Sequence, residues 1–225
     1  MSELILNLSF FFITLIVSFY LNGYINKVFV GNKLTDPVNE RSSHKYPATR
    51  SGGISIFFTV CLACAFGIST GQLSIPLYAL LSVFFLTFTG FADDLINIRY
   101  REKLFLQLFA AVLMFQTGYS IDSFHGVFNI YELPWWLEFV SSVFVFVVVV
   151  NALNLIDGLD GLASFISIKF FLVAGGIIFV SKPEWFLFFI LIISDLLGFW
   201  WFNFNRSWKV FLGDCGSLFI GLLTV

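Results

Sequence analysis

Seven long apolar runs divide this chain of 225 residues. A helix of about 20 apolar residues can cross the ~30 Å hydrocarbon core of a bilayer, because each residue adds about 1.5 Å. The runs therefore predict an all-α fold, a polytopic membrane helix bundle with seven spans and a truncated eighth. They cover residues 4–25, 53–70, 75–92, 104–121, 133–151, 162–180 and 185–202, and an eighth run begins at residue 215 and is cut off at residue 225.

The composition agrees with this interpretation. Hydrophobic residues make up 59% of the chain and charged residues 12%, whereas soluble domains have about 45–50% and about 25%. No internal repeat or linker is evident, so residues 1–225 are predicted to form a single integral-membrane domain, truncated at the C-terminus. No basic residue precedes the first run and no small-residue cleavage site follows it, which predicts a retained span rather than a signal peptide.

The basic residues predict how the bundle is oriented. Most of the twelve Lys and Arg lie in the first, third and seventh connections between runs. Cytoplasmic loops carry an excess of these residues. We therefore expect those three connections to be cytoplasmic and the N-terminus to lie outside.

Acidic side chains follow the apolar runs at three places. Asp93 and Asp94 end the third run, Asp214 follows the seventh, and Asn151, Asn154, Asp157 and Asp160 follow the fifth at steps of three residues. The parity of the spans puts all three groups on the cytoplasmic side. A lone Asp-Gly pair is more typical of a turn that caps a helix, so a shared site is favoured only because three groups are predicted at one membrane face.

Carboxylates gathered in this way repel one another. A pair 4 Å apart costs about 4 kcal/mol at an effective dielectric constant of about 20. A hard divalent cation relieves this repulsion, and Mg²⁺ usually takes one or two carboxylates and completes its shell with water and substrate phosphate. The pattern therefore predicts a phosphate-handling site. Lys103 and the basic first connection could neutralise the phosphates, although these cations equally serve as the topology signal.

Several motifs resemble those of the polyprenyl-phosphate N-acetylhexosamine-1-phosphate transferases of glycosyltransferase family 4, which include the peptidoglycan translocase. The form of the first motif is similar to the branch that initiates O-antigen, and hence to lipopolysaccharide and cell-wall biogenesis enzymes. The matching stretches lie in family order over almost the whole chain. They are residues 39–44 with Pro47, Arg50, Gly52 and Gly53; Asp93 and Asp94; residues 103–107; residues 151–162; and residues 211–217.

The resemblance implies transfer of a sugar 1-phosphate from a UDP-N-acetyl-sugar to undecaprenyl phosphate, with release of UMP. It implies that Asp214 binds Mg²⁺, with Mn²⁺ as the alternative, and that Asp93 and Asp94 prepare the lipid phosphate or help to hold the metal. Asn154, Asp157 and Asp160 would bind the uridine diphosphate end, and Lys103 and Arg50 would contact substrate phosphate. No catalytic role is assigned to His44.

The resemblance also implies a cellular setting. The enzyme would be a multi-pass protein of the bacterial inner membrane with its active site on the cytoplasmic face, in contact with membrane lipids and with no nucleic-acid partner. A homodimer is one arrangement it could take. The family carries a later cytoplasmic loop with a histidine-containing motif, and the chain ends before it.

Two other function classes compete with a transferase. Lys169 and Asp195 lie inside predicted spans, and intramembrane charges often mark transport paths, which favours a membrane transporter. The two residues are predicted to lie at nearly one depth and to form an ion pair across neighbouring helices; the alternative is that Lys169 extends to the cytoplasm while Asp195 faces the bundle interior. A structural membrane subunit is the third class, but it does not account for a gathered acidic site.

Overall fold

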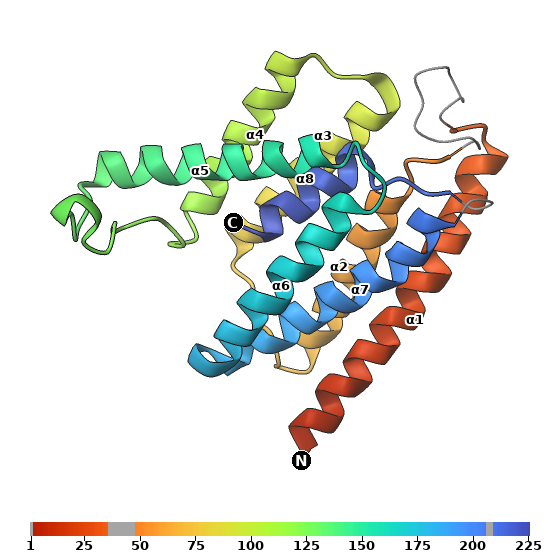
Figure 1. The fold of residues 1–225 in the computed structure, drawn as a ribbon, viewed down its shortest axis with the longest axis horizontal. Coiled ribbons are helices and arrows are strands. Elements are labelled where there is room, and N and C mark those ends of the chain that lie inside the picture. The colour runs from red at the N-terminus through yellow and green to blue at the C-terminus, as the bar shows by residue number, and fades with distance from the viewer. Residues whose placement is uncertain (1, 36–47, 206–208) are drawn as a thin grey trace.

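The described residues of the protein fold into α-helices joined by short connections (Figure 1). The structure is a computed structural model, and it describes residues 2–35, 48–205 and 209–225. The first-loop residues Asn39, His44 and Pro47 therefore lie outside the described residues. The helices are α1 (Ser2–Gly31), α2 (Gly52–Ser69), α3 (Leu77–Ile96), α4 (Tyr100–Phe115), α5 (Trp135–Ile156), α6 (Leu162–Ser181), α7 (Phe186–Phe204) and α8 (Gly213–Leu223).

Six helices in the described part of the chain are long and apolar enough to cross a membrane: α1, α2, α3, α5, α6 and α7. They correspond to six of the seven predicted spans, so the all-helical polytopic fold is confirmed. The predicted span at residues 104–121 differs, because α4 starts at Tyr100, ends at Phe115 and has only 16 residues. The truncated eighth run forms α8, which has 11 residues.

Several helices continue beyond the apolar runs from which they were predicted, and in α3 and α5 the added turns carry polar groups of interest. Helix α3 continues through Asp93 and Asp94 to Ile96, and Asn97 ends it in the left-handed conformation at φ 51°. Helix α5 continues to Ile156, so Asn154 lies on it. The predicted ends were set where hydrophobicity stops, but a helix ends where its last carbonyls are capped. The polar groups at these ends are therefore held on regular helix.

The short helix α8 lies between two groups of packed helices (Figure 1). Its residues Phe219 and Ile220 join the core made mainly by α2, α6 and α7, whereas Leu218 and Leu222 join a second core with residues of α3, α4 and α5. Nine of the eleven residues of α8 are buried. This burial fixes α8 in the middle of the bundle, with its N-terminus at the end where α3 and α5 finish.

Glycines let α8 approach its neighbours to backbone distance. A Cβ atom at Gly53 of α2 would lie 2.1 Å from the backbone nitrogen of Gly216, and one at Gly90 of α3 would lie 2.4 Å from the carbonyl oxygen of Asp214. Small residues at helix interfaces allow this close approach in membrane proteins. The N-terminus of α8 is thus set directly against α2 and α3.

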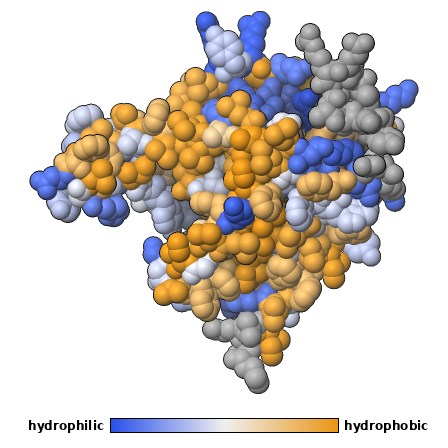
Figure 2. All heavy atoms as spheres, in the orientation of Figure 1, coloured by the Kyte–Doolittle hydropathy of each residue, from blue (hydrophilic) through white to orange (hydrophobic). Residues whose placement is uncertain are grey.

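The outside of the bundle is apolar. Many large side chains on the outer faces of the helices are exposed, including Phe12 of α1, Leu62 of α2 and Val173 of α6. In Figure 2 apolar side chains cover most of the visible face, and hydrophilic ones gather mainly along the upper edge and at the projecting end of α5. A soluble protein rarely exposes so large an apolar surface. The protein is therefore a multi-pass membrane protein.

The predicted ion pair between Lys169 and Asp195 is wrong. Lys169 is exposed on α6, and its ammonium group lies 5.7 Å from the ring centroid of Phe165, one turn nearer to the start of that helix. Asp195 on α7 is fully buried, and neither of its carboxyl oxygens has a hydrogen-bond partner. Depth alone was used to pair the two residues, whereas the rotation of each helix decides which way a side chain points.

Candidate active site

Asp94 caps the N-terminus of α8. Its two carboxylate oxygens accept hydrogen bonds from the backbone N–H groups of Asp214 (3.0 Å) and Cys215 (2.9 Å). Gly213 fits beside this carboxylate because it has no side chain; a Cβ there would lie 2.7 Å from an Asp94 oxygen, and its φ of 73° favours glycine. The first N–H groups of a helix have no partner within it and carry partial positive charge. Asp94 supplies that partner from a distant part of the chain.

Arg50 reaches the same place through pairing of two connecting segments. Thr49 and Val210 form an isolated parallel bridge, in which the Phe211 N–H donates to the Thr49 carbonyl at 2.7 Å. The Thr49 hydroxyl also donates to the Asn26 side-chain oxygen at 2.7 Å, which ties the segment to α1. The Arg50 guanidinium then lies 3.5 Å from Asp94. The first connection and the segment before α8 are thus fixed against each other over the end of α3.

Lys103 links two carboxylates. Its ammonium group lies 2.8 Å from Asp93 Oδ2 and 3.1 Å from Asp214 Oδ1. The second Asp93 oxygen accepts the Ile98 N–H at 2.8 Å, which orients the carboxylate from the turn after α3. Burial lowers the pKa of Lys103, but the hydrogen bond to Asp93 and the charge of Asp214 outweigh it, so its pKa is raised. The lysine is therefore held in its charged form between the two acids.

Asn154 holds Asp214 from the other side. Its side-chain amide donates to Asp214 Oδ1, and to the Ser217 hydroxyl at 2.8 Å. One turn earlier on α5, the Asn151 amide donates to the Gln107 side-chain oxygen of α4 at 2.8 Å. Steps of three residues around a helix therefore direct these two amides to different neighbours, Asn151 to α4 and Asn154 to α8.

Asp157 lies at the C-cap of α5, close to the same helix terminus. Burial, together with the negative charges of Asp214 and Asp94, raises its pKa to about 8, although the Gly213 N–H and Arg50 act in the opposite direction. Four carboxyl groups, those of Asp93, Asp94, Asp157 and Asp214, thus share the region around the start of α8 with two cationic groups, those of Lys103 and Arg50.

The pH dependence of stability should reveal Asp157. Because its pKa in the folded protein is above the ordinary value of 3.8, the folded state binds this proton more tightly than the unfolded state does. The protonated Asp157 side chain therefore makes its full contribution to the free energy of unfolding below pH about 4. That contribution is lost as the pH rises to about 8. In chelator, the apparent Tm of the wild type should fall over this range more than that of Asp157→Asn. Parallel Tm profiles would contradict the assignment.

Asp160 has a different partner. Its Oδ2 lies 2.7 Å from the Lys209 ammonium group, and its side chain is 36% exposed. Lys209 also lies over the Phe211 ring, at 5.6 Å from the centroid. The pair therefore joins the turn after α5 to the segment before α8. A role for Asp160 in binding uridine diphosphate stays a prediction.

The fit of a metal ion depends mainly on Asp214. In the described parts of the chain, no group of three or more His, Cys, Asp or Glu side chains has the spacing to hold one. Both oxygens of Asp94 are occupied by backbone N–H groups. Mg²⁺ needs only one or two carboxylates when water and substrate phosphate complete its shell. Asp214 with the neighbouring Asp157 fits that requirement, provided that substrate supplies the remaining oxygens.

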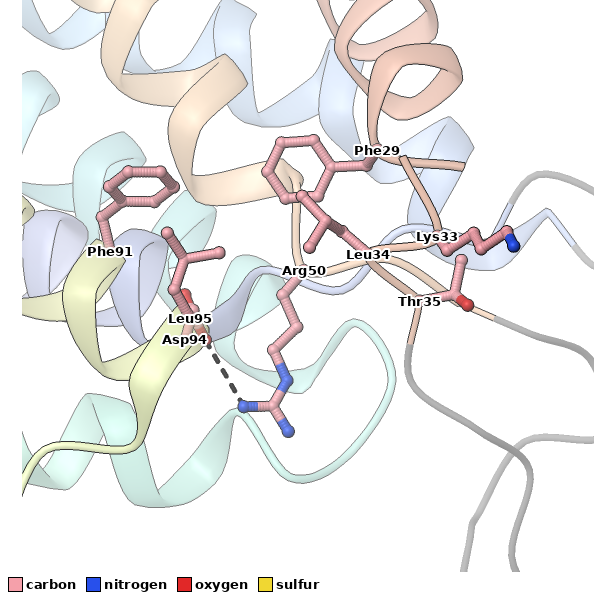
Figure 3. A pocket seen from close by; sticks show the side chains of 8 residues that line it. All are labelled: Phe29, Lys33, Leu34, Thr35, Arg50, Phe91, Asp94 and Leu95. Atoms are coloured by element: carbon pink, nitrogen blue, oxygen red, sulfur yellow. Dashed lines mark ion pairs between the residues drawn. The ribbon is translucent and has the colours of Figure 1, made fainter. Parts of the chain in front are cut away.

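A cavity of about 200 Å³ lies beside the pair of Arg50 and Asp94 (Figure 3). Phe29 and Leu34, from the end of α1 and the residues after it, line it together with Phe91 and Leu95 of α3. The Arg50 side chain reaches past these apolar groups toward Asp94 (Figure 3). The cavity therefore combines a cationic group with apolar walls at one end of the bundle.

The structure brings most of the residues singled out in the sequence to one helix end. These are Arg50, Asp93, Asp94, Lys103, Asn154, Asp157 and Asp214. Sequence reasoning assigned no role to Ser217 or Gln107, although both lie in the matched motifs. It counted Lys209 only as part of the topology signal. The cap that Asp94 provides for α8 was not predicted, and the action of Asp94 on substrate or metal stays a prediction.

Comparison with known proteins agrees with these motifs. A sequence model described as glycosyl transferase family 4 matches residues 76–225. A probable undecaprenyl-phosphate N-acetylglucosaminyl 1-phosphate transferase of Bacillus subtilis is 29% identical over 222 residues, covering 94% of this chain and 59% of that protein. The phospho-N-acetylmuramoyl-pentapeptide-transferase of Streptococcus sanguinis is 31% identical over 229 residues, covering 94% and 68%.

The corresponding transferase of Helicobacter pylori is 30% identical over 244 residues, covering 91% of this chain and 68% of its own. The chain thus spans from 59% to 68% of the length of these three relatives. The family match covers the site residues from Asp93 to Ser217, but it begins after Arg50. On this similarity, the chain belongs to glycosyl transferase family 4.

Proposed function

We propose that the protein transfers an N-acetylhexosamine 1-phosphate from a UDP-sugar to undecaprenyl phosphate and releases UMP, as an initiating step of cell-surface polysaccharide synthesis. One observation carries the proposal: Asp93, Lys103, Asn154, Asp157 and Asp214 converge at the start of α8, at one end of a membrane bundle. The names of the relatives, which refer to undecaprenyl phosphate and to sugar-phosphate transfer, support it.

The reaction requires alignment and charge neutralisation more than a reactive side chain. An oxygen of the lipid phosphate attacks the phosphorus atom bonded to the sugar, a new P–O bond forms, and the bond from that phosphorus to UMP breaks. Negative charge develops on the departing UMP. The Lys103 ammonium, which bridges Asp93 and Asp214, is positioned to stabilise it. Asn154 holds the Asp214 carboxylate in place while this occurs.

Mg²⁺, with Mn²⁺ as the alternative, would be held by Asp214 with Asp157 nearby, and when bound it supplies positive charge to the phosphates of the UDP-sugar. Asp157 has a proton to release at this point, because its pKa is raised to about 8 by burial and by neighbouring acids. Asp93 is oriented by Lys103 and by the Ile98 N–H. Its carboxylate would direct the lipid phosphate toward the sugar phosphate.

The acceptor lipid would use the cavity beside Arg50. The guanidinium group offers planar donors that suit a phosphate, and Phe29, Leu34, Phe91 and Leu95 offer apolar walls to the first prenyl units. A lipid acceptor also explains why the site lies at the end of the bundle, since the phosphate of such a lipid stays at the membrane surface.

An assay of UMP release by membranes that contain the protein tests the proposal. Membranes containing the protein in its natural full length are supplied with undecaprenyl phosphate and a panel of UDP-N-acetyl-sugars, and UMP release is measured. We expect release that requires both the lipid and one of the sugar nucleotides. Omitting the lipid is the control for simple hydrolysis. UMP formed equally without lipid, or none with any UDP-sugar, contradicts the proposal.

We place the site on the cytoplasmic face of the bacterial inner membrane. Asn32 after α1 and Tyr100 at the start of α4 belong to the basic connections, whereas Ser123 belongs to the connection without Lys or Arg. A single cysteine introduced at Asn32 or Tyr100, with the native cysteines removed, should be labelled only from the cytoplasm. One at Ser123 should be labelled only from outside. Labelling of Asn32 and Ser123 from the same side would contradict this orientation.

The positions of Lys169 and Asp195 no longer favour a transporter. Lys169 and Asp195 do not lie on a common path, because Lys169 is exposed on α6 and Asp195 is buried at α7. The described charged groups that do gather are at the helix ends, not midway along the spans. A transporter concentrates its polar groups near the midplane.

A further inference from the structure

Asp195 lies in the middle of α7, fully buried where α7 packs against α1 and α2. No described donor reaches either carboxyl oxygen. A carboxylate without a partner is among the least favourable groups to bury in a protein interior. Within the predicted membrane region, a cation, a proton or a water molecule could satisfy the Asp195 carboxyl. The side chains around it decide which of them fits.

The polar neighbours of this carboxyl offer oxygen lone pairs rather than protons. The Ser18 and Thr59 hydroxyl groups lie within interaction range of it. Each commits its proton elsewhere: Ser18 donates to the backbone carbonyl of Asp195 at 2.9 Å, and Thr59 donates to the Ser55 carbonyl at 2.9 Å. The Asn22 amide donates to the Ser18 hydroxyl oxygen at 3.3 Å, and that oxygen keeps one further lone pair. In this arrangement both hydroxyl groups therefore offer acceptor oxygens to the carboxyl.

The close packing disfavours a hydrated metal ion. A Cβ atom at Gly198, one turn after Asp195, would lie 2.6 Å from the Ser18 hydroxyl oxygen and 3.2 Å from the Leu15 carbonyl. Helices α1 and α7 therefore touch through their backbones at this level. The titratable side chains that the structure describes on the surrounding helices are Tyr20, Tyr24 and Lys27 of α1, Cys61 and Cys64 of α2, and Lys169 of α6. The two cationic ones, Lys27 and Lys169, are both exposed.

We infer that Asp195 is a buried proton-binding site, in which the neutral carboxylic acid donates a hydrogen bond to the Ser18 or Thr59 hydroxyl oxygen. A single proton satisfies the acid and one of the acceptors that face it. It removes the charge that would otherwise be buried, and it needs no additional space. The proton joins α7 to α1 or α2 by a hydrogen bond whose donor exists only in the neutral acid. This site is separate from the proposed transfer site and does not depend on it.

Infrared spectroscopy of the full chain in lipid nanodiscs tests the inference. The spectrum of wild type minus Asp195→Asn at neutral pH should contain the carbonyl stretch of a protonated carboxyl, which lies above the amide I band, and no carboxylate bands. Asp122→Asn, in an exposed connection, is the matched control and should give carboxylate bands instead. Carboxylate bands from Asp195 would overturn the inference.

Two further measurements are made on proteins in which Asp195 is unchanged. Ser18→Ala or Thr59→Val removes one acceptor, and one of the two should shift the carbonyl stretch to higher frequency; a band that neither variant moves would overturn the acceptor assignment. The apparent Tm of the wild type should be the same in Na⁺ as in choline. A Na⁺-dependent rise in Tm that Asp195→Asn abolishes would identify a bound metal ion in place of the proton. Asp195→Asn should itself change Tm by less than about 4 °C.

Discussion

Replacement of Asp214 by asparagine is expected to reduce UMP release by about 10³-fold, the upper range for removal of one electrostatic group from an active site. Asparagine keeps the size of the side chain but removes the charge that pairs with Lys103 at 3.1 Å and that would hold a divalent cation. A neutral amide binds a divalent cation more weakly than a carboxylate does, so asparagine would not replace Asp214 in the proposed role. The loss should appear in kcat at saturating substrates.

The same variant should remain folded. The Asp214 backbone N–H donates to Asp94 whichever side chain is present, so the apparent Tm should change by less than about 4 °C. Asp122→Asn, in an exposed connection, controls for loss of an acidic residue and should keep wild-type activity. Transfer by Asp214→Asn within about tenfold of the wild type would show that the cation, if one is needed, is held elsewhere.

Asp94 should behave as a positioning residue. Asp94→Ala leaves the N–H groups of Asp214 and Cys215 without their acceptor, and an unsatisfied buried donor costs about 1–3 kcal/mol. At about 2–4 °C per kcal/mol for a chain of this size, we expect the apparent Tm to fall by about 2–12 °C. Transfer should fall about 10²-fold, because α8 no longer holds Asp214 in position.

The asparagine variant separates the two roles of Asp94. Asparagine keeps one acceptor oxygen for the start of α8, but its NH2 group cannot accept the second backbone N–H. Asp94→Asn should therefore melt between the wild type and Asp94→Ala, and it should lose less rate than Asp94→Ala. If Asp94 takes part in the chemistry, Asp94→Asn will be as inactive as Asp94→Ala while melting at a higher temperature. Measuring Tm and UMP release on the same preparations decides between these outcomes.

Hydrophobic length in the sequence was sufficient to predict the helices. The sequence also predicted that Asp93, Asp94, Asp157 and Asp214 lie together, but it did so by counting seven spans, and the described part of the chain has six helices long enough to cross a membrane. It could not predict that Asp94 caps α8. That contact joins a side chain to backbone N–H groups 120 residues later, and only the packing of α3 against α8 brings them together. The ion pair of Lys169 and Asp195 failed for a related reason, since depth in the membrane says nothing about helix rotation.

Counting Lys and Arg along the sequence likewise did not show which residues these side chains contact. Lys209 was read as part of the topology signal, whereas in the fold it pairs with Asp160. The helix predicted at residues 104–121 instead begins at Tyr100 and ends at Phe115. For Lys209 the sequence showed the charge, but only the tertiary structure showed its partner.

The backbone contacts at Gly53 and Gly90 have a consequence for how the site can diversify. The separation of α2, α3 and α8 is set by main-chain atoms, which have no alternative rotamers with which to adjust. A larger or differently shaped sugar therefore cannot be accommodated by spreading these helices. Changes in donor preference would have to arise in the segments around the rim, while the carboxylates keep one geometry. A site held in this way could not easily rearrange to weaken the binding of an inhibitor that matches its geometry.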